Sequence, residues 1–226
     1  MKLSNRLQLL LGMIADQYEQ IWDCCCDHGY LGQAILNTRP KAQVHFLDVV
    51  PSITTQLEQK LRQSEFSQDR WAVHCGDIQQ FVLPKSDSCL SAQGRKLLVI
   101  AGVGGDLTLD MVSAVLHNNP DSDIDFLICP VRQLYKVRSG VQKLGLGLVN
   151  EAIVKDSGRY YEAIHISTLS QKEVHVVGEL MWDLTQEGHQ EYLRQNISHY
   201  KRMQAQGNES VRKILAEYMK LQELPA

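Results

Sequence analysis

The feature that most constrains the fold is an alternation of short apolar segments with segments of helical periodicity. The apolar segments are Ile21–Cys25, Val44–Leu47, Trp71–Cys75, Lys96–Ala101 and Ile124–Cys129. Helical patterns follow over residues 31–36, 51–62, 107–116 and 135–144. Continuously apolar strands that alternate with helices are typical of a parallel sheet covered on both faces. The chain therefore predicts an α/β fold built from five strand–helix units.

The end of this unit follows a different pattern. Leu148–Val154 and Tyr160–Leu169 are rich in β-forming residues, and only the turn-like segment 155–159 separates them. Two adjacent strands joined by a tight turn are antiparallel, so the predicted sheet is mixed, with helices on both faces. Apolar residues at helical spacing predict an additional helix before the first strand; they are Leu3, Leu7, Leu10, Leu11 and Ile14.

The C-terminal part is predicted to be a helical hairpin. From about Gly178 the periodicity is helical, and Gln206-Gly207-Asn208 interrupts it. We expect two parts, a sheet domain over residues 1–170 and a helical, coiled-coil-like appendage over residues 171–226. One interpretation is a hairpin that packs against itself or the sheet domain; the other is a coiled coil that binds RNA or a partner chain. Positive charge for the second alternative comes from Lys201, Arg202, Arg212, Lys213 and Lys220.

Composition and motifs exclude several classes of protein. The formal net charge of −3 does not indicate nucleic-acid binding. Nucleic acids bind to a local patch of positive charge, however, and the total charge of a chain does not report such a patch. No stretch of about 18 apolar residues is present, so we expect no membrane span. The consecutive Cys24-Cys25-Cys26 argues against a disulfide framework and favours the reducing cytoplasm, and no zinc-type cysteine spacing predicts a metal. A polar loop is expected over Lys85–Arg95.

Acidic residues and glycines follow successive predicted strands. Asp23 and Asp27 flank the first turn, Asp48 ends the second strand and Asp77 follows the third. Open α/β sheets bind ligands along the edge where parallel strands end, and an acid there accepts hydrogen bonds from ribose hydroxyls. Asp48 or Asp77 taken alone is also consistent with an aspartate that merely starts a turn. The glycines of 102–105 indicate either a close approach of the backbone to a ligand or a plain turn. The sequence contains neither a phosphate-binding P-loop motif nor the dinucleotide pattern G-x-G-x-x-G.

These segments together resemble the bacterial tRNA (adenine-22-N1)-methyltransferase family, the TrmK family. The resemblance covers about Leu3 to Leu169. It rests on Leu3-Ser4-x-Arg6-Leu7, Asp23, Asp27-His28-Gly29-Tyr30-Leu31, Asp48-Val49-Val50, Gly76-Asp77, Ile100-Ala101-Gly102-Val103-Gly104-Gly105, Pro130 and Gly158-Arg159-Tyr160-Tyr161-Glu162. It implies a Rossmann-like class I methyltransferase fold, S-adenosyl-L-methionine (SAM) as cofactor and tRNA as partner.

The resemblance also implies roles for individual residues. Asp27 is the expected catalytic carboxylate. SAM is expected to contact Asp23, Cys25, His28, Leu31, Asp48, Val49, Asp77, Ile78, Ala101 and Gly102. The substrate is expected to contact Arg6, Tyr30, Gly104, Gly105, Pro130 and Tyr161, with Tyr30 or Tyr161 stacking on the base. Arg6, Lys136 and Arg138 are candidate phosphate contacts by charge alone.

Two positions depart from the family pattern. The family has glycine where this chain has Cys25, and an asparagine commonly follows the proline that corresponds to Pro130. Alternative functions are therefore methylation of another RNA base or of a small molecule, or a non-catalytic interaction role. The sequence does not predict an oligomeric state.

Overall fold

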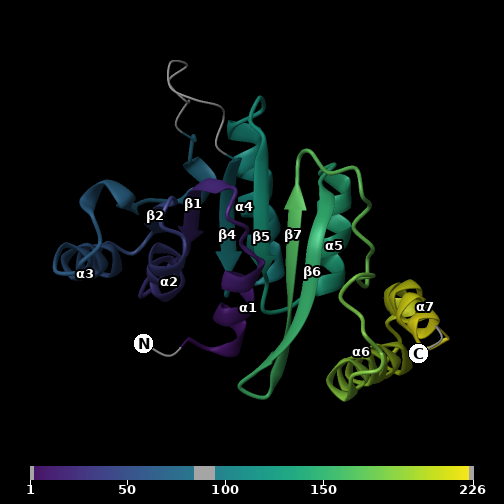
Figure 1. The fold of residues 1–226 in the computed structure, drawn as a ribbon. Helices are drawn as coiled ribbons and strands as arrows, with labels where there is room; N and C mark the ends of the chain where they lie inside the picture. The colour runs from purple at the N-terminus through teal and green to yellow at the C-terminus, as the bar shows by residue number, and fades with distance from the viewer. Residues whose placement is uncertain (1–2, 84–94, 224–226) are drawn as a thin grey trace.

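The computed structural model describes residues 3–83 and 95–223, and in these residues one seven-stranded sheet has the order β3-β2-β1-β4-β5-β7-β6 (Figure 1). Neighbouring strands from β3 to β5 are parallel, and β7 is antiparallel to both β5 and β6. This confirms the predicted mixed sheet. The strands are β1 (Tyr18–Cys24), β2 (Gln43–Asp48), β3 (Trp71–Cys75), β4 (Arg95–Ala101), β5 (Ile124–Cys129), β6 (Gly147–Asp156) and β7 (Arg159–Ser167).

Helices cover both faces of the sheet, as expected for parallel strands with crossover connections (Figure 1). The helices of the sheet part are α1 (Asn5–Met13), α2 (Tyr30–Thr38), α3 (Pro51–Arg62), α4 (Gly105–Asn118) and α5 (Leu134–Lys143). Short 3-10 helices lie on either side of β3, namely η1 (Gln68–Arg70) and η2 (Ile78–Gln80). Between β3 and β4 the described residues contain η2, and the sequence predicted no helix after this strand. The predicted polar loop falls outside the described residues apart from Arg95, which begins β4.

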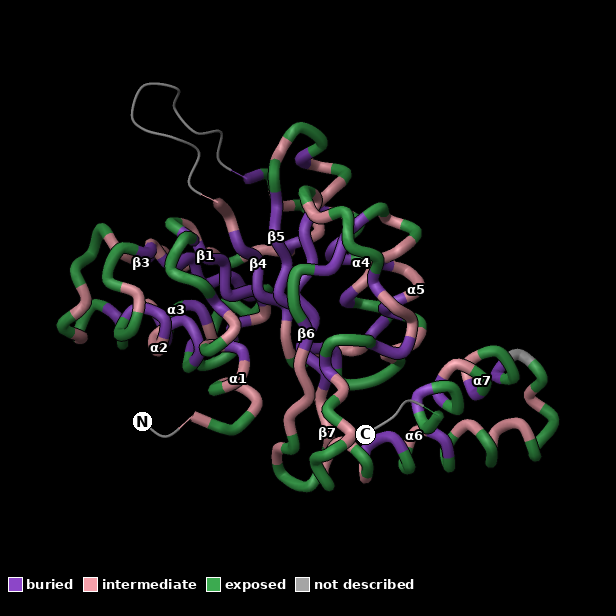
Figure 2. Tube along the Cα trace, turned by 45° about the vertical axis from the view of Figure 1, so that its right-hand side comes forward, coloured by how far each residue is buried: buried purple, intermediate pink, exposed green. Residues whose placement is uncertain are grey.

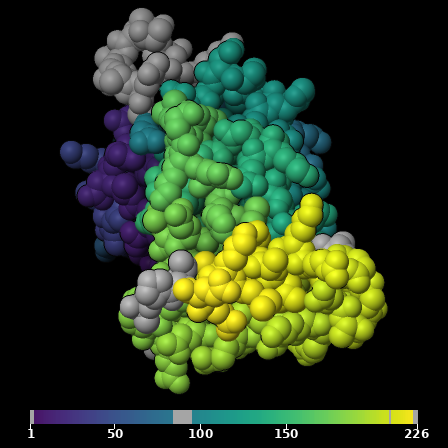
Figure 3. Space-filling view, turned by 90° about the vertical axis from the view of Figure 1, so that its right-hand side faces the viewer, coloured from purple at the N-terminus to yellow at the C-terminus, as the bar shows by residue number. Residues whose placement is uncertain are grey.

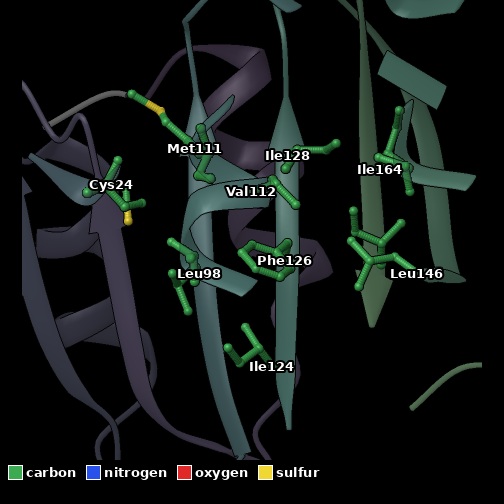
Figure 4. Packing of buried hydrophobic residues seen from close by; sticks show 14 of the residues in the cluster. Cys24, Leu98, Met111, Val112, Ile124, Phe126, Ile128, Leu146 and Ile164 are labelled. Carbon is green, nitrogen blue, oxygen red and sulfur yellow. The ribbon is translucent and has the colours of Figure 1, made fainter. Parts of the chain in front are cut away.

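The strands supply two hydrophobic cores because successive residues point to opposite faces of the sheet. Leu98 joins the core beneath α4 and α5, where Phe126, Met111 and Val112 also lie (Figure 4). Leu97, the preceding residue, joins the core beneath α1, α2 and α3. The tube in Figure 2 shows buried residues concentrated along the central strands. The side chains of β4 are therefore buried on both faces of the sheet, as its continuous apolar sequence predicted.

The β6–β7 hairpin closes more tightly than its sequence predicted. Its turn contains only Ser157 and Gly158, with φ of +49° and +77°. Positive φ at both central residues is typical of the type I′ turn, whose twist matches that of the flanking strands. Lys155, Asp156 and Arg159, which were predicted to lie in the turn, belong to the strand ladder.

The C-terminal segment forms the predicted pair of helices, but helix begins later than expected. Residues 178–186 form turns, α6 spans Glu187–Ala205, and α7 (Arg212–Leu221) follows η3 (Glu209–Val211). The two helices share a small core that also receives Tyr135 from α5. Figure 3 shows them as one mass at an end of the molecule. The hairpin thus packs on itself and on the sheet part; its independence as a domain remains a prediction.

A buried ionic cluster joins the sheet to the segment that leads into α6. The fully buried Arg138 of α5 pairs with Glu151 of β6 at 2.6 Å and with Glu162 of β7 at 2.8 Å. Glu151 Oε1 accepts backbone N–H bonds from residues 179, 180 and 181, and Glu162 accepts the hydroxyl of Tyr192 on α6. One guanidinium carries a single positive charge and cannot neutralise two carboxylates. The additional hydrogen bonds therefore help to stabilise the buried negative charge of Glu151 and Glu162.

We predict that Arg138→Met lowers the free energy of unfolding by about 3–5 kcal/mol, because it leaves two buried carboxylates without their cation. Lys136→Met is the matched control on the same helix. Lys136 is exposed and pairs with the exposed Asp106, so its loss should cost at most about 1 kcal/mol. Urea denaturation measures both values; equal losses in the two variants would contradict the assigned role of Arg138.

Candidate active site

The predicted acids and glycines meet at one edge of the sheet. In the parallel register, Cys24 lies beside Leu47 and Ile100, and Asp48 lies beside Cys75. Asp27, Asp77 and the 102–105 loop follow these strand ends directly. Their proximity follows from the parallel direction of the four strands, since parallel strands all end at the same edge.

The turn after β1 has an unusual backbone. Cys25 and Asp27 adopt φ of +59° and +48°, in the left-handed region that favours glycine. Hydrogen bonds hold this turn, because the N–H groups of Cys25 and Cys26 both donate to the carbonyl of Leu47. The left-handed conformation at Cys25 is a physical reason for the glycine found there in the resembling family.

Asp23 is more deeply buried than Asp48. Its side chain is only 5% exposed, and its Oδ2 accepts the N–H of Gly32 in the first turn of α2 at 2.9 Å. Burial raises the pKa of Asp23 to about 7, the Gly32 hydrogen bond lowers it in part, and the nearby Asp48 raises it further. The carboxyl therefore holds its proton to a higher pH than an ordinary aspartate does.

Asp48 and Asp77 hold the neighbouring loops. Asp48 Oδ1 accepts the N–H of Val50 at 3.0 Å, and its Oδ2 accepts the N–H of Asp27 at 3.2 Å. Asp77 Oδ1 accepts the N–H of Gln79 at the start of η2. Both acids thus act as turn residues, which was the simpler interpretation of each. A carboxylate oxygen has two lone-pair sites, so both acids retain capacity to accept hydrogen bonds from a ligand.

A cavity of about 250 Å³ opens between the turn after β1, the start of α1 and the end of β4. It brings together nine of the predicted site residues, namely Arg6, Asp23, Cys25, Asp27, His28, Tyr30, Leu31, Ala101 and Gly102. Leu7, Cys24, Cys26 and Val103 also line it and were not predicted. Leu7 and Val103 are apolar members of the matched motifs, and only the packing of α1 against this edge shows that they face the cavity.

Arg6 contributes a cation to this cavity from a distant part of the sequence. Its guanidinium lies 5.1 Å from the ring centre of Tyr161 on β7, so the predicted pair of substrate residues is in contact. Its Nε is buried and has no hydrogen-bond partner among the described residues. A buried donor without a partner is costly, and it indicates a place for an acceptor from a bound ligand.

The remaining predicted site residues lie outside the cavity lining. Val49 is exposed beside Asp48, whereas Ile78 is buried in the core and Pro130 is buried after β5. Gly104 and Gly105 adjoin the 131–133 loop, and a side chain on Gly105 would lie 2.8 Å from the carbonyl oxygen of Arg132. Close packing against this loop explains why Gly105 is a glycine.

One predicted phosphate contact is wrong and another is engaged elsewhere. Arg138 is fully buried in its ionic cluster, so it cannot reach an RNA backbone. Charge alone misled the prediction, because the helical position of Arg138 places it inside. Lys136 is exposed and pairs with Asp106. In the described residues, no group of three or more His, Cys, Asp or Glu side chains is arranged to hold a metal ion, and no helix is long and apolar enough to cross a membrane.

A family model of methyltransferase domains matches residues 3–164. The chain belongs to this methyltransferase family. The matched region of the methyltransferase includes α1, the whole cavity lining and the sheet as far as β7. The comparison with curated proteins found no match.

Solved structures share the fold of this methyltransferase, two of them over almost its whole length. The Bacillus subtilis m1A22 tRNA methyltransferase TrmK is 20% identical, with a TM-score of 0.72 and coverage of 98% of this chain and 96% of that one. Mycoplasma capricolum TrmK in complex with S-adenosyl-homocysteine is 18% identical, with a TM-score of 0.69 and coverage of 97% and 94%. A SAM-dependent methyltransferase from Aquifex aeolicus is 12% identical, with a TM-score of 0.55 and coverage of 73% and 88%. The C-terminal helices are thus part of the fold shared with the two TrmK structures.

We predict that Cys25→Gly raises the free energy of unfolding by about 1 kcal/mol, because glycine adopts the left-handed conformation without strain. Cys24→Gly is the matched control. Cys24 lies in β1, is buried and has ordinary strand geometry, so its replacement should destabilise the protein. Thermal and urea denaturation measure both variants, and destabilisation by Cys25→Gly would contradict the strain assigned to this turn.

We predict that Asp23→Asn becomes more stable relative to the parent as pH rises from about 4 to about 7. The folded pKa of Asp23 is raised above its ordinary value of 3.8, so over this interval the unfolded chain loses the Asp23 proton while the folded chain keeps it, which destabilises the parent but not the asparagine variant. The pH-dependent part of the difference in free energy of unfolding should reach about 4 kcal/mol above pH 7 and vanish below pH 4. A difference independent of pH, measured by urea denaturation across this range, would contradict the raised pKa.

Proposed function

We propose that this methyltransferase transfers a methyl group from SAM to N1 of an adenine in tRNA, at the position equivalent to adenine 22. The observation that carries the proposal is the cavity in which Arg6, Asp23, Asp27, Tyr30 and Gly102 meet at the carboxyl edge of the sheet. Support also comes from the two similar TrmK structures, one of which is named as an m1A22 tRNA methyltransferase.

The residues of this edge fit SAM. Gly102 has φ of +85°, and a side chain there would meet only the Arg6 guanidinium at 3.8 Å, so its bare backbone is open to a ligand rather than required by packing. Asp48 would accept hydrogen bonds from ribose hydroxyls, and Asp77 would accept one from the adenine amino group. Asp23 would accept a hydrogen bond from the α-amino group, while Arg6, whose Nε has no hydrogen-bond partner among the described residues, would donate to an acceptor in the cavity. When bound, SAM supplies an electrophilic methyl group on a sulfonium.

Asp27 is the residue proposed to act on the substrate. Its side chain is 67% exposed at the cavity mouth, so it reaches a base without being buried itself. Methylation at N1 leaves a positively charged adenine, and a carboxylate beside it stabilises that charge or accepts the proton from N6. His28 lies 3.7 Å from Asp27 and 5.5 Å, ring to ring, from Tyr30. Tyr30 is 41% exposed, which makes it a better stacking surface than Tyr161, whose ring is covered by Arg6.

The cellular setting of the proposal is the cytoplasm. Cys24, Cys25, Cys26, Cys75 and Cys129 are free thiols in the described structure, in keeping with a reducing compartment. The C-terminal helices are proposed to form an arm that helps to hold the tRNA, since several of their cationic side chains are exposed.

We predict that Asp27→Asn lowers kcat for tRNA methylation by about a hundredfold or more, because the charge and the proton acceptor are lost together. Asparagine tolerates the left-handed backbone of this residue, so the turn should keep its shape. The SAM dissociation constant, measured by calorimetry, should therefore remain unchanged. Asp110→Asn, an exposed residue on α4 outside the cavity lining, is the control and should keep full activity.

The assay uses labelled SAM and unmodified tRNA, followed by mapping of the methylated nucleoside. The expected product is 1-methyladenosine. Another methylated nucleoside would favour a different RNA base as substrate, and methylation of small molecules alone would overturn the RNA assignment. Absence of SAM binding at millimolar concentration would favour the non-catalytic alternative. Full activity of Asp27→Asn would remove Asp27 as the catalytic carboxylate.

A further inference from the structure

A second hollow, of about 120 Å³, lies between the start of α2 and α3. Ile53 and Leu57 supply its apolar residues, and Gln56 and Lys60 supply polar groups from α3. Gly29 makes this close approach of the two helices possible, because a side chain there would lie 2.7 Å from Leu57. None of the matched motifs includes these four residues of α3, so the sequence did not indicate the hollow.

This hollow adjoins the active-site cavity directly. Asp27, His28 and Tyr30 line both of them. The two hollows therefore lie on either side of one short segment of chain. A polymer that places one unit in the cavity would place a neighbouring unit over Tyr30 and into the second hollow.

The chemistry of the hollow suits an anionic polymer with flat units. Lys60 Nζ lies 5.4 Å from the ring centre of Tyr30 and pairs with no carboxylate in the described structure. The acid nearest to it in sequence, Glu58, is engaged by Arg62 at 2.6 Å. Asp27 is the one acid among the described residues that line the hollow, and it also faces the cavity. An exposed aromatic ring beside an uncommitted cation is a common combination in single-stranded RNA sites.

We propose that this hollow binds the nucleotide next to the methylated adenine, with Lys60 contacting its phosphate and Tyr30 with Ile53 contacting its sugar or base. The inference rests on the proposed function, since it takes the cavity to hold an RNA base. Lys60 is thus a substrate-binding residue outside the matched motifs. Its contribution is to RNA binding and not to the bound cofactor or the methyl-transfer step.

The test compares Lys60→Gln with the parent enzyme on full-length tRNA. Three tRNAs, assembled by ligation, carry an unmodified backbone or a single neutral methylphosphonate on the 5′ or 3′ side of the target adenosine. We expect Lys60→Gln to raise KM about tenfold and to reduce the salt dependence of binding by about one charge, with kcat and the SAM dissociation constant unchanged. For the parent enzyme, one of the two neutral linkages should raise KM by a similar factor, and Lys60→Gln should be insensitive to that linkage.

Lys41→Gln is the matched control. Lys41 is equally exposed but precedes β2, at the opposite edge of the sheet, so KM should not change. An unchanged KM for Lys60→Gln would overturn the inference. It would also be overturned if the fold-increases in KM caused by the variant and by the neutral linkage multiplied when combined. Both outcomes would leave the proposed function intact. Failure of the parent enzyme to methylate any RNA would overturn the proposed function, and the inference with it.

Discussion

At the start of α2, the N–H of Gly32 donates a hydrogen bond to the buried carboxylate of Asp23, and Phe46 occupies the space that a side chain on Gly32 would need. This contact brings α2 directly onto β1 and β2. The intervening turn must then be short and must adopt left-handed conformations at Cys25 and Asp27. The cavity lies between this turn, the start of α1 and the end of β4. Its cost is a buried acid with a raised pKa, which is a common property of functional sites.

The acids at the sheet edge have two tasks that do not compete. Asp48 binds backbone N–H groups from two different loops, and Asp77 begins a 3-10 helix. Each therefore shapes the site even without a ligand, while unused lone pairs remain for hydrogen bonds to SAM. The choice between turn residue and ligand-binding residue, which the sequence left open, is consequently not exclusive. Pre-formed loops of this kind reduce the entropy that a ligand must lose on binding.

The buried Arg138 cluster connects this site-bearing sheet to the C-terminal helices. Because the guanidinium joins β6, β7 and the segment before α6, the hairpin cannot swing freely without exposing or unpairing buried charges. An arm held in this way keeps a defined position relative to the cavity. That property is useful if the same tRNA contacts both, since a fixed second contact adds affinity only where the geometry allows both to form.

The sequence by itself determined the strand–helix order, the antiparallel last pair and the position of Asp23, Asp48, Asp77 and Gly102 at one edge. Periodicity is a local property, and strands that alternate with helices pair in parallel and end at the same edge. Only the tertiary structure decided which side chains face the cavity. It buried Arg138 instead of exposing it, placed Arg6 over Tyr161 and opened the hollow beside Lys60. These outcomes depend on how distant helices pack on the sheet. Charge and motif position do not encode that packing.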